Sequence, residues 1–177
     1  MIKKKKLNKF ANLLFVCLLF LLIFKLLICS ETLTSKRLFT ISKNRNKNIV
    51  VYDVQMHNGK IINKNPIKVY WLIYTNNKFV YKDINNLEER AYGVKILTNN
   101  NNNLVLILKA VPNRPINIQY TTNGPKAELY INHQKAYISN VYVHTATTKS
   151  IIPKVIYYII KGINVNNGSY IEEKVFL

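Results

Sequence analysis

Two patterns of apolar residues divide the chain. The first is an almost unbroken apolar run over residues 10–24, which follows a head of lysines and shows no amphipathic helical period. The second consists of short stretches rich in Val, Ile, Tyr and Thr, separated by turn residues at short intervals. The pattern therefore predicts a leader at 1–30, a polar tether at 31–47 and a single β-rich domain at 48–177.

The β-rich part alternates between strand and turn signals. Strands are predicted at 48–55, 67–75, 78–84, 94–98, 104–111, 116–121, 127–132, 136–145, 154–161 and 170–176. Three Asn-Gly dipeptides (58–59, 123–124 and 167–168) supply the positive φ that tight turns require, and Asn76-Asn77 fits a two-residue hairpin. No long crossover helix separates the strands, so a mainly antiparallel sheet is expected.

One segment breaks this rhythm. Residues 86–93 (Asn-Leu-Glu-Glu-Arg-Ala-Tyr-Gly) predict a short helix, in which Asn85 or Asn86 caps the start and Gly93 takes a left-handed conformation at the end. In the tether, Leu38, Phe39 and Ile41 form the one apolar cluster, which allows one short strand at most.

The predicted fold class is all-β, a mainly antiparallel β-sandwich or β-barrel with one short helix, preceded by an N-terminal hydrophobic signal or anchor helix.

The leader combines a basic head, an apolar middle and a small polar exit, which is the pattern of a secretory signal. Its apolar stretch also reaches the roughly 18–20 residues that span a bilayer. The lysines favour the cytoplasmic side, so the rest of the chain is predicted to be exported. Three fates stay open: cleavage near Ser30, retention as a membrane anchor through residues 10–28, and lipidation at Cys29. The domain would accordingly be periplasmic or in the secretory pathway, or anchored to the membrane with a cytoplasmic N-terminus.

Charge and cysteine content narrow the function classes. The 177 residues include 26 basic and 8 acidic side chains, a formal charge of +18, of which the first 30 residues contribute six lysines. Just four of the basic residues are Arg, whereas proteins that read nucleic-acid grooves rely on Arg for bidentate contacts. Together with export, this predicts no nucleic-acid partner. Both cysteines, Cys17 and Cys29, lie in the leader, which excludes a disulfide or a thiol nucleophile from the exported domain.

Catalytic motifs are sparse. The sequence contains no phosphate-binding loop, dinucleotide fingerprint or nucleophile elbow, so no cofactor is predicted. The three histidines (His57, His133 and His144) are widely spaced in the sequence, so no metal site is predicted. An alternative function is a metal-free hydrolase or lyase, with His144 as base and Glu128 or Asp53 orienting it. The simpler interpretation is that each of these two acids is buried beside a Lys or Arg.

Some strands carry bulky side chains on both faces, as at 67–74 and 155–160. Such strands either lie in the centre of a sandwich or line a cavity. The leading hypothesis is therefore a non-enzymatic binding module for an apolar small molecule, a lipid or a protein partner. The predicted ligand-binding residues are Tyr70, Trp71, Arg90 and Tyr92. The alternative is that Trp71 is a core residue and Arg90 pairs with a neighbouring acid.

The order of motifs is similar to that of a known family. Residues 48–53 (Asn-Ile-Val-Val-Tyr-Asp) and 65–74 (Asn-Pro-Ile-Lys-Val-Tyr-Trp-Leu-Ile-Tyr) are followed by the elements at 89–94, 130–132 and 153–155. This succession resembles the exported domain family catalogued as domain of unknown function number 4833, over about residues 48–175.

Two features depart from that family. Glu89 stands where the family often has Gln, and the Asn run at 99–103 is particular to this chain. The resemblance implies an exported, single β-rich domain, and it brings no activity, substrate or catalytic residue.

Overall fold

The computed structural model describes residues 33–100, 103–146 and 154–177, and residues 34–177 form one compact unit. The predicted leader at 1–30 lies outside the described residues, so its fate stays a prediction. Within the described part of the chain, no helix is both long enough and apolar enough to cross a membrane.

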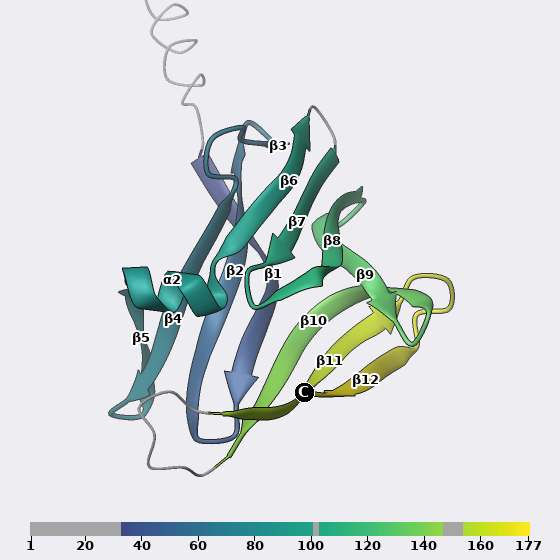
Figure 1. Cartoon of the computed structure of the whole chain (residues 1–177). Helices are drawn as coiled ribbons and strands as arrows, with labels where there is room; N and C mark the ends of the chain where they lie inside the picture. Colours follow the sequence, from purple (N-terminus) through teal and green to yellow (C-terminus); the bar gives the residue numbers. More distant parts are fainter. Residues whose placement is uncertain (1–32, 101–102, 147–153) are drawn as a thin grey trace, which may run out of the picture. The chain divides into compact units, whose positions relative to one another are not determined.

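The described residues form strands and one short helix (Figure 1). The elements are β1 (Leu33–Lys43), β2 (Asn46–His57), β3 (Lys60–Ile61), β4 (Ile67–Thr75), β5 (Lys78–Asp83), α2 (Asn86–Tyr92), β6 (Val94–Asn100), β7 (Asn103–Leu108), β8 (Val111–Thr121), β9 (Gly124–Ile131), β10 (Gln134–Thr145), β11 (Val155–Asn164) and β12 (Tyr170–Phe176). All ten predicted strands are present, with some ends shifted, and the predicted helix is confirmed. Strand β3 was not predicted, and β1 is longer than the one short strand expected at most in the tether.

Asparagine and glycine make the tight turns. Asn76 and Asn77 have φ of 49° and 59° and join β4 to β5, while Asn132 and His133, at 46° and 63°, join β9 to β10. Asn tolerates this left-handed region better than most residues, and Gly enters it at no steric cost. The glycine of each predicted Asn-Gly turn has a positive φ, which confirms those turns.

The strands form one sheet that branches at β10. Its order is β5-β4-β2-β1-β10-β9-β8-β7-β6, while β11 pairs with β10 and β12, and β3 pairs with β2. One edge of β10 pairs first with β9, over Gln134–Tyr137, and then with β1, over Asn140–Val143; the other edge pairs with β11. The sheet curls into a half-barrel (Figure 1), which is neither a closed barrel nor two separate sheets.

The prediction of a polar tether is wrong for residues 33–43, because they form β1 in the middle of the sheet. Leu38, Phe39 and Ile41 are buried in the core, and β1 runs parallel to β10, with Thr40 opposite Asn140. Every other strand pair with a described register is antiparallel, as expected. Too few apolar residues lie here to signal so long a strand, because pairing with β10, which is distant in the sequence, helps to determine it.

The helix α2 is capped by Asn85, one of the two residues predicted for this role, and the cap is a capping box. Asn85 Oδ1 accepts hydrogen bonds from the backbone N–H groups of Leu87 and Glu88, and Glu88 Oε2 accepts one from Asn85 N. The predicted left-handed end is wrong, because Gly93 has φ −64° and ψ 163°, an extended conformation. Glycine is needed there for space, since a Cβ would press against the carbonyl oxygen of Glu89.

A buried tyrosine fixes the end of α2 to the sheet. Tyr52 on β2 is fully buried and donates a hydrogen bond of 2.7 Å to the carbonyl oxygen of Tyr92. Its ring stacks on Phe39 of β1, with the ring centroids 4.4 Å apart. Tyr92 is thereby held at a fixed position above the sheet.

Candidate functional site

The inner face of the curled sheet is built from rows of side chains that cross β1, β10, β11 and β12. One row is Ile41, Val141, Ile160 and Glu173, and the next is Lys43, Val143, Tyr158 and Val175. Residues directly opposite each other on paired strands point to the same face of a sheet. Each row therefore presents its side chains on one face.

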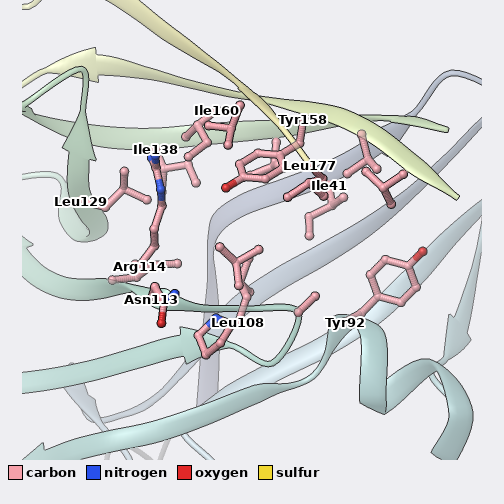
Figure 2. Close-up of a pocket in the computed structure, with 18 of the residues that line it drawn as sticks. Ile41, Tyr92, Leu108, Asn113, Arg114, Leu129, Ile138, Tyr158, Ile160 and Leu177 are labelled. Atoms are coloured by element: carbon pink, nitrogen blue, oxygen red, sulfur yellow. The ribbon is translucent and has the colours of Figure 1, made fainter.

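Apart from Lys43 and Glu173, which do not line it, the residues of these rows form one wall of a cavity of about 540 Å³ (Figure 2). The facing walls come from Tyr92 at the end of α2, from residues around the β7–β8 connection such as Leu108, and from Leu129 on β9. The lining is mostly aliphatic, and its other members are Tyr92, Tyr158, Asn113 and Arg114. The volume of the cavity lies within the range of about 300–1,000 Å³ that is usual for small-molecule sites.

On one side of the cavity, the charge of Arg114 is neutralised by an ion pair with Glu173. Arg114 Nη1 donates to Glu173 Oε2 at 2.9 Å, its Nη2 contacts Oε1, and Asn132 N donates to the same carboxylate at 3.0 Å. The hydrogen bonds from Arg114 lower the pKa of Glu173, with a smaller contribution from Asn132. A second, more polar pocket of about 280 Å³ shares Arg114 as part of its wall and adds His133.

On the opposite side, Tyr92 lines the cavity, and Trp71 and Lys43, which do not line it, contact the ring of Tyr92. Figure 2 shows Tyr92 and Arg114 on opposite sides. Trp71 and Tyr92 meet edge to face, with centroids 5.1 Å apart, and Lys43 Nζ lies 4.8 Å from the centroid of each ring. The indole N–H of Trp71 is buried and has no hydrogen-bond acceptor among the described residues.

The structure brings together two of the four predicted site residues. Trp71 and Tyr92 are in contact, and Tyr92 lines the cavity. Tyr70 lies on the other face of β4, because successive residues of a strand alternate. Arg90 is exposed on α2 and forms no ion pair with any described residue. That these four residues bind a ligand stays a prediction.

Tyr70 belongs to a separate polar cluster. Its hydroxyl donates to Asp53 Oδ2 at 2.8 Å and accepts from Arg37 Nη2 at 3.2 Å, and Arg37 Nε lies 3.5 Å from Asp53 Oδ1. Burial and the hydrogen bond to Asp53 raise the pKa of Tyr70. The buried carboxylate thus has a basic partner, which is the simpler of the two roles expected for Asp53.

The residues of the alternative hydrolase are not brought together. His144 stacks on Tyr157, with centroids 4.6 Å apart, and its buried Nδ1 has no hydrogen-bond partner in the described part of the chain. Glu128 instead pairs with Lys135 Nζ at 3.6 Å. Glu128 lies opposite Tyr137 of β10, seven residues before His144, which places them about 20 Å apart along the strand.

Metal-ligating side chains do not gather at the site either. Within residues 33–100, 103–146 and 154–177, no group of three or more His, Cys, Asp or Glu side chains could hold a metal ion.

The family model described as Domain of unknown function (DUF4833) matches residues 39–174 of this chain. The chain belongs to this family. The match begins nine residues before the region in which the sequence showed its resemblance, and so takes in the end of β1 that carries Ile41 and Lys43. No curated protein and no solved structure matches the chain.

The DUF4833 cavity is largely made of residues that the sequence did not single out. The continuous apolar run at 155–160 predicted a strand with bulk on both faces, and Tyr158 and Ile160 from it do line the cavity. Lys43 was missed, because it stood in the predicted tether. The alternation of Ile41, Ser42 and Lys43 was the available signal, and it became meaningful once β10 was placed beside it.

Proposed function

We propose that this DUF4833 domain is a non-enzymatic binding module that takes an apolar small molecule or a lipid chain into the half-barrel. The observation that carries this proposal is the cavity of about 540 Å³ with a mostly aliphatic lining. A packed core normally leaves few voids larger than a water molecule, whereas ligand sites are concave and mostly apolar.

The chemistry of the lining supports binding rather than catalysis. Arg114 is already held by Glu173, and His144, the proposed base of the alternative enzyme, is stacked against Tyr157 without a carboxylate partner among the described residues. A protein partner, the other ligand class expected from the sequence, would use a sheet edge such as β5, where Phe79, Val80 and Tyr81 are exposed. The cavity is the stronger argument, because its size and lining define the chemistry of the occupant.

Native mass spectrometry of the purified full chain tests the proposal, followed by extraction and identification of any molecule that co-purifies. A bound apolar molecule or lipid supports it. A mass equal to that of the protein alone, together with no uptake of decan-1-ol at concentrations just below its solubility, contradicts it.

We further propose that the domain acts outside the cytoplasm, either released or held at the membrane through residues 10–28. The basic head and apolar run of the leader support this placement. Fractionation of cells that express the full chain tests it. Recovery in the cytoplasmic fraction at its full mass would contradict export, and release from membranes by high salt would contradict a spanning anchor.

A further inference from the structure

We propose that the cavity selects an amphiphile with one apolar chain and an anionic head, and that Lys43 holds the head. This inference rests on the proposed function, because it names the class of ligand that the same cavity takes. A carboxylate and a phosphate share the chemistry required, so either head fits the proposal.

The first argument is the balance of charge on the two sides of the cavity. The guanidinium of Arg114 is neutralised by the carboxylate of Glu173. Lys43 forms no ion pair with any described carboxylate, and its recorded contacts are with the faces of Trp71 and Tyr92. An uncompensated cation beside an apolar cavity favours an anionic group on the ligand.

The sequence around Lys43 supplies no acid. Arg45 follows in the turn after β1, and the first acidic residue along the described chain is Asp53. Asp53 is engaged by Arg37 and Tyr70. The acids on α2 are also engaged, since Glu89 pairs with Lys109 Nζ at 2.8 Å and Glu88 lies 3.9 Å from Lys82 Nζ.

The second argument is geometric. Lys43 lies directly opposite Val143, which lines the cavity, so its side chain starts from the inner face of the sheet about 5 Å from that wall. Its Nζ then lies over Tyr92, another wall residue. With the head group on this side, the apolar chain of the ligand would extend past Val141 and Ile160 toward Arg114.

A third observation concerns hydrogen-bond donors. The ammonium group of Lys43 has three N–H donors, and aromatic faces satisfy a cation without accepting them as an oxygen does. An oxyanion supplies the acceptor that the ammonium group of Lys43 lacks among the described residues.

The test compares decanoic acid, decyl phosphate and the uncharged decan-1-ol at neutral pH, binding to the full chain and to Lys43→Met. We expect one or both anions to bind the unaltered chain about tenfold more tightly than the alcohol, because a hydrogen bond to a charged group outweighs a neutral one. Lys43→Met keeps a side chain of similar length without the charge, and this variant should bind all three probes alike. Lys78→Met, which removes a lysine from the exposed strand β5, is the matched control and should keep the preference.

The outcomes separate the two proposals. If no probe binds the unaltered chain, the proposed function fails. If the alcohol binds as well as both anions, or if Lys43→Met keeps the preference, the head assignment fails while the binding function stands. Should Lys43→Met not fold, Lys43→Arg and Lys43→Gln replace it, with the preference expected to survive in the first and vanish in the second.

Discussion

Filling the cavity from one wall should raise stability and weaken binding together. Val141 is 7% exposed and lies between Ile41 and Ile160 on the inner face. In Val141→Phe, the larger ring adds roughly 50 Å³ to the side chain, and at ~24 cal/mol per Å³ of cavity filled this stabilises the fold by about 1.2 kcal/mol. For a domain of this size, the melting temperature should rise by about 3–5 °C.

Binding should move in the opposite direction. The added ring takes the room of about two methylene groups of a ligand, and at ~0.8 kcal/mol for each this weakens the binding of decanoic acid about 15-fold. Urea unfolding followed by circular dichroism measures the first effect, and isothermal titration calorimetry measures the second. Val80→Phe on the exposed strand β5 is the control and should change neither quantity appreciably. A Val141→Phe protein that loses stability, as overpacking of a filled core does, and binds as before would refute the cavity.

Three further changes test the structural account. Tyr52→Phe leaves the carbonyl oxygen of Tyr92 without its hydrogen bond, so the free energy of unfolding should fall by about 1–2 kcal/mol; an unchanged urea midpoint would show that this bond does not hold α2. Because Arg114 lowers the pKa of Glu173, this carboxylate stabilises the fold above its unfolded pKa of about 4.3, and the stabilisation is lost as the pH falls through the folded pKa. Glu173→Gln should therefore destabilise at pH 7 and much less near pH 2–3, whereas an equal loss at both pH values would contradict the ion pair. Asn85→Ala removes the helix cap and should lower the free energy of unfolding by about 1 kcal/mol, with the loss of helical signal confined to α2; full retention of stability would count against the capping box.

The sequence predicted those elements that local chemistry determines. Asn76-Asn77 and the Asn-Gly turns mark hairpins because few other residues accept positive φ, and Asn85 with Glu88 marks the helix start. It failed at the extent of β1, one of whose two neighbours in the sheet, β10, is distant in the sequence, with Thr40 opposite Asn140. Gly93 shows a third case, in which the right residue was noticed for the wrong reason, since close packing against Glu89 rather than a left-handed φ requires it.

The residues of the candidate site were likewise predictable only where local sequence determines them. Trp71 and Tyr92 were predicted from their aromatic character, and they meet beside the cavity. Tyr70 was grouped with Trp71, although strand alternation sends these neighbours to opposite faces. The aliphatic wall could not be predicted, because Val141 and Ile160 face a cavity or a packed core according to how the sheet curls, and the curl depends on the branch at β10.

The parallel pairing of β1 with β10 also determines how late in synthesis this part of the sheet can form. Thr40 is synthesised about a hundred residues before its partner Asn140, which at roughly 5–20 residues per second leaves β1 without that partner for about 5–20 s. During this interval β1 can pair with β2, its other neighbour in the sheet, but its edge toward β10 stays unpaired, and such distant pairings slow folding itself. The edge of β1 that faces β10 therefore stays open until β10 is made, and an open strand edge is a site at which chains can pair wrongly and aggregate.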